Sequence, residues 1–332
     1  MSNSPTASTP AADSTPPPGR RVRKGLKVTL LSIAGVLAVV VVGLIGTTTV
    51  NAIASASEAD DIERYGRLVD VDGKKMNVAV QGAGDQTVVL LPGFGTASPV
   101  LDFAPLVDEL KSHYRVVVVE PFGYGLSDET EKPRTSANIA GEVHEALQQL
   151  SIDRYALMGH SIAGIYGLEY VNLFRDEVTA FVGIDSSVPT QPGMDAEFPI
   201  DALRTAKSLG LVRVLSAAAG DPYAGLPFSD EQKKQMGILS LRNGFTATYA
   251  DEMEHFASNF RDAQRLSFPK DLPLLLFVQD DNTDVPGWLA LHEEQAAASD
   301  RSELVRLKAG HYLHHTKSPE IAAATEAFLA AG

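Results

Sequence analysis

A serine flanked by small residues follows a short apolar stretch near the middle of the chain. Residues 154–164 read Arg-Tyr-Ala-Leu-Met-Gly-His-Ser-Ile-Ala-Gly, close to the Gly-x-Ser-x-Gly pattern in which a strand turns sharply into a helix. Small residues flank such a serine because a Cβ there would collide with a neighbouring element. Ala163 replaces the second glycine, and Gly164 follows it. The spacing predicts Ser161 as a hydrolase nucleophile, whereas a serine that only caps a helix is the plainer alternative.

A histidine near the C-terminus can supply the base that such a serine needs. A predicted last strand over residues 303–307 leads to Gly310 and His311, and a predicted helix over residues 318–330 closes the chain. Ligands and catalytic groups of open parallel sheets gather at the carboxyl ends of the strands. We therefore expect His311 to accept the proton of Ser161.

The acid that orients the histidine has several candidates. An apolar run over residues 272–279 predicts a buried strand, and it is followed by Asp280, Asp281 and Asp284. Asp185, at the end of a predicted strand over residues 179–184, is a further candidate. Asp280 is better interpreted as a solvated loop carboxylate or a helix cap.

The remaining chemistry lies on loops between predicted strands and on an insertion. Predicted strands over residues 87–91 and 114–120 lead to glycine-rich turns. About 85 residues separate Asp185 from the strand that starts at Leu272, far more than a connection requires. Apolar residues at helical spacing predict that this insertion is a helical cap, which would favour an apolar acyl or alkyl group in the substrate.

Four segments together carry a resemblance to a known family. They are Pro92-Gly93-Phe94-Gly95, Gly123-Tyr124-Gly125-Leu126-Ser127-Asp128, Gly159-His160-Ser161-Ile162-Ala163-Gly164 and Gly310-His311. From Tyr65 to Leu329 the chain resembles the α/β-hydrolase superfamily, in particular the capped serine hydrolases related to carboxylesterases, proline iminopeptidases and C–C bond hydrolases. The resemblance implies a mostly parallel central sheet with helices on both faces and a helical cap. Ser161 argues against the haloalkane dehalogenase and epoxide hydrolase branches, whose nucleophile is an aspartate.

The resemblance also ranks the acids and implies an oxyanion hole. The family's strand-end pattern places the acid at Asp281, with Asp284 second and Asp185 third, because some members draw the acid from the earlier strand. The backbone N–H groups of Phe94 and Ile162 would bind the oxyanion. Two departures are Pro92-Gly93 in place of the usual His-Gly pair and the lack of a glycine after the strand that precedes Asp281.

These residues predict cleavage of a carboxylic ester or amide with an apolar group through an acyl-enzyme on Ser161. An alternative is an exopeptidase of the proline iminopeptidase type, in which Asp251, Glu252 or Glu254 of the cap would hold the substrate amine. An alternative of another class is a non-catalytic surface-binding protein on a hydrolase scaffold.

The N-terminal region predicts a membrane anchor. Residues 28–50 contain no charge and, as a helix, would span about 34 Å, enough for a bilayer core of about 30 Å. Five basic residues precede this run and none occurs in residues 51–63, which places the N-terminus in the cytoplasm and the catalytic domain outside. Ala54-Ser55-Ala56 has the form of a processing site, so a signal peptide cleaved after Ala56, giving a secreted protein, is the rival interpretation.

The domain organisation follows from these assignments. We expect a disordered cytoplasmic tail over residues 1–27, a transmembrane helix over 28–50, a linker over 51–61, a hydrolase core over 62–185 and 271–332, and a helical cap over 186–270.

Charge and composition limit the partners and cofactors. The first 27 residues carry a net charge of +4 and the remainder −18, which disfavours nucleic acid as a partner. The chain has no cysteine, so disulfides and thiolate ligands are excluded. No cofactor is expected, because no phosphate-binding or dinucleotide motif is present. His311, His314 and His315 are close in sequence, but no carboxylate stands beside them at a ligand spacing, so no metal is expected.

Overall fold

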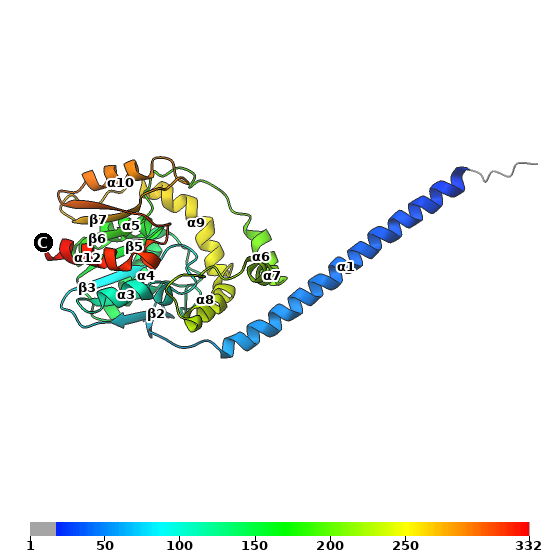
Figure 1. Cartoon of the computed structure of the whole chain (residues 1–332), viewed down its shortest axis with the longest axis horizontal. Helices are drawn as coiled ribbons and strands as arrows, with labels where there is room; N and C mark the ends of the chain where they lie inside the picture. Colours follow the sequence, from blue (N-terminus) through cyan, green and yellow to red (C-terminus); the bar gives the residue numbers. More distant parts are fainter. Residues whose placement is uncertain (1–17, 332) are drawn as a thin grey trace, which may run out of the picture.

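The computed structural model describes the backbone of residues 18–331 and the side chains of residues 25–331. Of the tail that we expected to be disordered, residues 1–17 lie outside the described residues. Residues 18–27 belong to a long helix, α1 (Pro18–Asp60), which also includes the expected transmembrane segment and nearly all of the expected linker. Figure 1 shows that α1 extends away from a rounded remainder of the chain.

The centre of the remainder is one eight-stranded sheet in the order β1-β2-β4-β3-β5-β6-β7-β8. The first three strands in this order pair antiparallel and all later pairs are parallel. The strands are β1 (Arg67–Val71), β2 (Lys74–Gln81), β3 (Thr87–Leu91), β4 (Arg115–Glu120), β5 (Tyr155–His160), β6 (Val178–Ile184), β7 (Leu274–Gln279) and β8 (Ser302–Leu307). The expected mostly parallel sheet is confirmed, and the hairpin of β1 and β2 adds an antiparallel edge that the sequence analysis did not assign.

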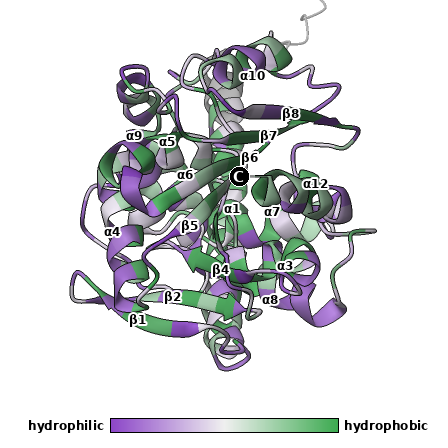
Figure 2. Cartoon of the chain, turned by 90° about the vertical axis from the view of Figure 1, so that its left-hand side faces the viewer, coloured by the Kyte–Doolittle hydropathy of each residue, from purple (hydrophilic) through white to green (hydrophobic). Residues whose placement is uncertain are grey.

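Apolar side chains of the central strands point to both faces of the sheet. Val89 and Leu91 belong to one apolar core, whereas Val88 and Leu90 belong to the other. Such strands require a helical layer on each side, and Figure 2 shows their hydrophobic colouring between the helices. One core includes α4 (Ser136–Gln149), α5 (Ala163–Leu173) and α10 (Trp288–Ala297); the other includes α2 (Pro99–Asp102), α3 (Ala104–Leu110), α11 (Leu313–Thr316) and α12 (Ser318–Ala330). The 3-10 turn η1 (Arg175–Glu177) follows α5 and buries none of its residues.

The insertion between β6 and β7 consists of four helices, as the sequence predicts for a cap. They are α6 (Ile200–Ser208), α7 (Leu211–Ala219), α8 (Asp230–Asn243) and α9 (Ala247–Ala263). Gly210, with a φ of +73°, turns the chain between α6 and α7. Figure 1 shows α8 and α9 against the body of the protein and α6 and α7 on the side that faces α1.

Candidate active site

Ser161 occupies a sharp turn between β5 and α5. Its φ is +56°, a left-handed conformation that non-glycine residues seldom adopt. Close packing fixes the turn, because a Cβ on Gly159 would lie 3.0 Å from that of Ala163, and one on Gly164 would lie 2.3 Å from the carbonyl oxygen of Ser187. Ala163 is therefore accommodated where the pattern has glycine, and Gly164 allows the close approach to the chain after β6. Strained backbone of this kind is typical of functional sites.

The loop after β3 lies directly beside the serine. β3 pairs with β5 so that Leu91 is opposite Gly159, and the chain order of the sheet reverses between these strands, the usual location of a binding crevice. A Cβ on Gly93 would lie 3.1 Å from the Cβ of Ser161 and 2.7 Å from Nδ1 of His160. Only glycine lets this backbone approach the serine so closely.

The two backbone N–H groups expected to form an oxyanion hole are in this region. Phe94 follows Gly93, and Ile162 follows Ser161 at the start of α5. Within the described residues, neither N–H donates a hydrogen bond to another backbone or side-chain group. Donors left free at the end of a strand-to-helix turn are suited to an anionic oxygen.

His311 and Asp185 are joined by a hydrogen bond between side chains. Nδ1 of His311 lies 2.7 Å from Oδ2 of Asp185, which is fully buried, whereas 42% of the His311 side chain is exposed. Asp185 directly follows β6, the neighbour of β5, and its φ is +43°. In residues 25–331 the Ser161 hydroxyl forms no hydrogen bond with His311. Such contacts are often longer in unliganded hydrolases than in their complexes with substrate.

The contact partner of His311 differs from the acid that the sequence analysis preferred. Asp281 and Asp284 are exposed in the loop that leads to α10, and neither contacts His311 in the described structure. Asp280 pairs with Arg306. We expected His311 to contact Asp281, and the structure corrects this: His311 contacts Asp185. The chain after β7 leads Asp281 and Asp284 toward solvent, whereas β6, which precedes Asp185, is the direct neighbour of β5.

Two further groups fix the Asp185 carboxylate. Its Oδ1 accepts hydrogen bonds from the backbone N–H of Gln279, at 2.9 Å, and from Nε1 of Trp288, at 2.7 Å. Trp288, the only tryptophan in the chain, begins α10 and is buried. Two hydrogen bonds to the same oxygen hold the carboxylate in one orientation. The sequence analysis missed Trp288, which no motif indicates.

A second set of histidines ties the His311 loop to the rest of the site. His160 is buried, and its Nε2 donates to the carbonyl oxygen of His311 at 3.1 Å. Burial, with the neighbouring His314 and His311, lowers the pKa of His160 well below its ordinary value, so its ring is neutral at pH 7. The contact connects the turn at Ser161 to the loop that contains His311.

Asp102 of α2 binds two histidines of α11, and no motif in the sequence indicates this contact. Nε2 of His314 lies 2.7 Å from one carboxylate oxygen, and Nε2 of His315 lies 2.8 Å from the other. These three residues are also the set that could hold a metal ion, since their ligand atoms lie within 4.8 Å of one another. The fold therefore brings Asp102 to His314 and His315, which have no carboxylate close to them in the sequence. The hydrogen bonds from the two rings to both oxygens of Asp102 explain this cluster without a metal ion.

Aromatic side chains of the cap pack against the loop after β3 (residues 92–95), which we call the oxyanion loop because Phe94 is expected to donate to an oxyanion. The Phe94 ring lies 4.8 Å from that of Tyr249 and 5.9 Å from that of Phe256, both on α9. Phe256 in turn lies 5.6 Å from Phe198, which precedes α6. The cap side of the loop after β3 is therefore lined by aromatic rings, as expected beside a site that accepts an acyl or alkyl group.

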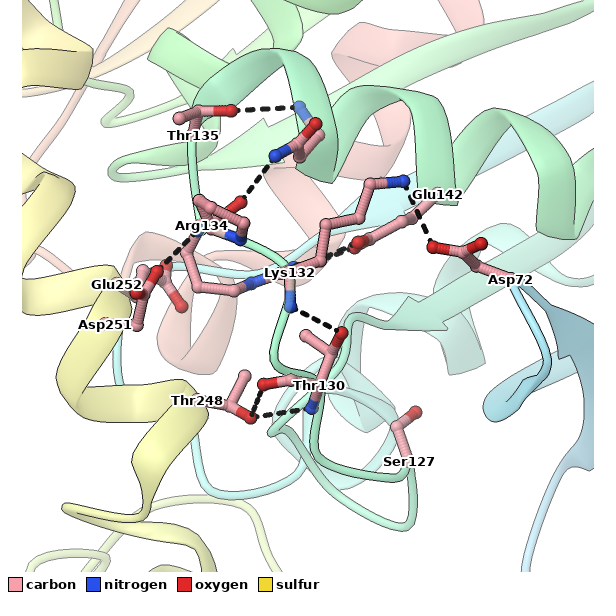
Figure 3. Close-up of polar contacts among 12 residues, drawn as sticks. Asp72, Ser127, Thr130, Lys132, Arg134, Thr135, Glu142, Thr248, Asp251 and Glu252 are labelled. Carbon is pink, nitrogen blue, oxygen red and sulfur yellow. Dashed lines mark hydrogen bonds and ion pairs between the residues drawn. The ribbon is translucent and has the colours of Figure 1, made fainter.

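The cap carboxylates are engaged in contacts with the core. Glu252 is buried and accepts hydrogen bonds from the hydroxyls of Tyr124, at 2.9 Å, and Tyr166, at 2.7 Å; burial raises its pKa. Asp251 accepts from the backbone N–H of Arg134 at 2.6 Å, as Figure 3 shows, and Glu254 is exposed. Of these three cap carboxylates, Glu252 and Asp251 thus attach α9 to the core.

Comparisons with known proteins agree with this architecture. The Alpha/beta hydrolase family matches residues 88–325. The uncharacterized protein YbdG of Bacillus subtilis (strain 168) is 28% identical over 236 residues, which cover 68% of this chain and 72% of that protein.

Two solved structures share the fold. An enol-lactonase from Burkholderia xenovorans LB400 superposes with a TM-score of 0.58 at 20% identity, covering 80% of this chain and all of that one. A membrane phospholipase A described as a bacterial virulence factor superposes with a TM-score of 0.59 at 19% identity, covering 94% of this chain and 98% of that one. The second match is longer than residues 62–332, so it extends into α1. The family model matches more than half of this chain, and the mostly parallel sheet and the strand-to-helix turn agree with it. This chain therefore belongs to the alpha/beta hydrolase family.

Proposed function

We propose that this protein is a membrane-anchored serine hydrolase that cleaves carboxylic esters with an apolar group through an acyl-enzyme. The observation that carries the proposal is the juxtaposition of Ser161, in a strained turn, with the hydrogen-bonded pair of His311 and Asp185 at adjacent strand ends. Nucleophile, base and orienting acid in this order of contact form the arrangement that activates a serine.

The reaction divides into two transfers at one carbonyl carbon. Ser161 Oγ attacks the carbonyl carbon while Nε2 of His311 takes the hydroxyl proton, and Asp185 stabilises the resulting imidazolium. The N–H groups of Phe94 and Ile162 bind the oxyanion. The carbon–oxygen bond to the alcohol then breaks, His311 returns its proton to the leaving alcohol, and water hydrolyses the acyl-enzyme by the same steps to release the acid.

The apolar cap and the occupied cap carboxylates favour an ester over an amino-terminal peptide. Phe94, Tyr249 and Phe256 present rings to the site. An exopeptidase would need a carboxylate free to bind an ammonium group, and the one buried candidate, Glu252, is already bound by two tyrosine hydroxyls.

The anchor is proposed from α1. Residues 25–60 form a helix long and apolar enough to cross a membrane, and none of its most apolar window is buried in the protein. We place the N-terminus in the cytoplasm and the hydrolase outside, because the basic residues precede the apolar run. Ala54, Ser55 and Ala56 lie inside this continuous helix, which favours an intact anchor over cleavage after Ala56.

Labelling of the full chain with a fluorophosphonate tests the catalytic proposal. We expect a single modified residue, Ser161, because only a serine beside a base is activated at neutral pH. Ser161→Ala should abolish labelling and lower turnover of p-nitrophenyl esters by about 10⁶. Ser187→Ala is the matched control, since Ser187 contacts the same turn only through its backbone, and it should keep most of the activity. An unlabelled, inactive wild-type protein would instead indicate a non-catalytic binding scaffold.

A further inference from the structure

The turn between α6 and α7 packs directly on the anchor helix. Thr47 of α1 donates a hydrogen bond to the carbonyl oxygen of Leu209 at 2.7 Å. A Cβ on Gly210 would lie 2.5 Å from the carbonyl oxygen of Thr47, so the two backbones are in close contact. Thr47 belongs to the uncharged run over residues 28–50. The cap therefore meets α1 at the end of its apolar segment.

Arg213 of α7 fixes this position with a fork of hydrogen bonds to α1. Its guanidinium binds both carboxylate oxygens of Glu58, at 2.5 and 2.7 Å, as well as Asn51 Oδ1 at 3.0 Å and Ser55 Oγ at 3.1 Å. Only 16% of the Arg213 side chain and 26% of the Glu58 side chain are exposed. Bidentate pairs of this kind set a defined geometry between two elements.

The other cap helices are attached differently. α9 binds the core through Thr248 and Asp251, which contact the loop that contains Thr130 and Arg134 (Figure 3). In the described structure α6 and α7 bury no side chain. The α6–α7 hairpin (residues 200–219) is therefore held by polar contacts on two sides, by α1 and by Lys207, which donates to the carbonyl oxygens of Arg242 and Gly244 at the end of α8.

The outer face of α7 is apolar and uncovered. Val214 is 49% exposed and Leu215 is 68% exposed. The helix has the sequence Leu-Val-Arg-Val-Leu-Ser-Ala-Ala-Ala, in which Arg213, bound to α1, is the single charged residue. A short helix with an apolar face beside the end of a membrane span is suited to the boundary between lipid head groups and acyl chains.

From these contacts we propose that the α6–α7 hairpin lies on the surface of the membrane that holds α1, and that the substrates are amphiphilic esters taken from that membrane. This inference rests on the proposed function, both the membrane anchor and the esterase chemistry. About 20 residues of α1 suffice to cross the bilayer core. Counted from Val28, where the uncharged run begins, they end near Thr47, so the hairpin beside Thr47 lies at the level of the head groups.

A series of aromatic contacts leads from the hairpin to the site. Phe198 precedes α6 and contacts Phe256, which contacts Phe94 of the oxyanion loop. An acyl chain that leaves the membrane at the hairpin would thus meet apolar side chains as far as the proposed oxyanion hole.

Single cysteines test the membrane contact, because the native chain has none. Leu215→Cys, Leu173→Cys and Val36→Cys in the full chain are each labelled with a nitrobenzoxadiazole fluorophore and placed in vesicles of phosphatidylcholine and phosphatidylglycerol that contain doxyl-labelled lipid. Leu173, at the end of α5, is a matched control that is 50% exposed and lies outside the hairpin. We expect quenching at positions 215 and 36 and none at position 173.

The quenching results at positions 36 and 215 distinguish the anchor from the hairpin contact. Quenching at position 36 without quenching at position 215 overturns the hairpin proposal while the anchor stands. Absence of quenching at position 36 overturns the anchor itself. Cross-linking of two copies through position 215, without quenching there, shows that a second copy covers α7 and also overturns the proposal.

The Arg213 fork provides a second test with a functional measurement. Arg213→Ala should lower hydrolysis of a long-chain ester dissolved in the vesicles by about fivefold or more, while hydrolysis of a water-soluble acetate stays unchanged. Arg204→Ala, on the exposed side of α6, should change neither rate. The exchange of charges in the double variant Arg213→Glu/Glu58→Arg should restore most of the rate on the vesicle-borne ester. An equal loss of rate on both esters in Arg213→Ala would overturn the membrane proposal. The variant Ser161→Ala tests the proposed esterase chemistry separately, because it should lose activity on both esters.

Discussion

Asp185 Oδ2 lies 2.7 Å from Nδ1 of His311, although 126 positions separate the two residues in the chain. The contact forms because β6, which ends at Asp185, is the neighbour of β5 in the sheet, while the loop after β8 returns over the same edge. Trp288 and Gln279 hold the second oxygen of the carboxylate. His311 is thus oriented by a carboxylate with no other ionic partner among the described residues.

Substitution of this carboxylate tests its role directly. Asp185→Asn should reduce turnover of an ester at neutral pH by about 10⁴, because the amide cannot hold the correct tautomer of His311 or stabilise its charged form. Asp281→Asn and Asp284→Asn are matched controls on the exposed loop and should stay within about tenfold of wild type. A collapse in Asp281→Asn with an active Asp185→Asn would restore the assignment that the family pattern suggests.

The close approach of the oxyanion loop predicts the effect of a single methyl group. In Gly93→Ala the new Cβ would meet Nδ1 of His160 at 2.7 Å, so the loop must move away from Ser161. Loss of one oxyanion donor costs about 10² to 10³ in turnover, and we expect a decrease of that order in kcat. Gly141→Ala, on α4 with open space at its Cβ, should leave kcat unchanged and stabilise its helix slightly.

The buried ion pair of Arg134 and Glu142 predicts a large effect on stability. The two side chains lie 2.7 Å apart and are 0% and 1% exposed. Figure 3 shows the pair beside the contacts of α9 with the core. Glu142→Ala leaves a buried guanidinium without its partner and should lower the free energy of unfolding by about 3 kcal/mol or more. Urea denaturation of the full chain in detergent measures this change. The exposed substitution Glu131→Ala should alter the free energy by no more than about 0.5 kcal/mol, and equal effects of both would contradict the reasoning.

Buried histidines predict how stability depends on pH. Burial holds the pKa of His160 well below 6.5 in the folded protein, whereas the unfolded chain has the ordinary value. The unfolded state therefore binds the extra proton between these two pKa values, so this stabilising contribution is complete above about pH 6.5 and is lost as the pH falls toward the folded pKa.

His160→Gln should reduce this acid sensitivity. The variant removes up to about 1.4 kcal/mol per pH unit of slope in that range, while its amide can still donate to the carbonyl oxygen of His311. Melting temperatures between pH 7.5 and 5.5 check the result. Part of the slope should remain, because burial also lowers the pKa of His314, and an unchanged slope would mean that His160 is not buried in solution.

The contacts of Asp102 predict a structural rather than a metal-dependent role. Asp102→Asn presents an N–H group to at least one imidazole donor and should destabilise the protein by about 1 to 3 kcal/mol. Chelation with EDTA should leave both melting temperature and activity unchanged. Stoichiometric zinc in the purified protein, lost in Asp102→Asn, would show that Asp102, His314 and His315 are metal ligands.

Local sequence determined a large part of this protein. The apolar runs predicted the bounds of β3, β4, β6, β7 and β8 within two residues, and a short apolar stretch before Ser161 indicated β5 without an exact range. The small residues around Ser161 predicted the sharp turn that the structure contains. These features are encoded locally, because strand formation and a strained turn depend on neighbours along the chain. The placement of His311 after the last strand followed from the same signals.

Tertiary structure alone decided which distant groups meet. Aspartates follow two of the predicted strands. Which of them contacts His311 depends on the order of the strands in the sheet and on Trp288, whose Nε1 donates a hydrogen bond to Asp185. The carboxylate beside His314 and His315 comes from Asp102, more than 200 positions away. The linker expected over residues 51–61 is almost entirely helical, with Glu58 and Asn51 bound to Arg213 of the cap. Such contacts are formed between side chains brought together by the whole fold, and no periodicity in a single segment records them.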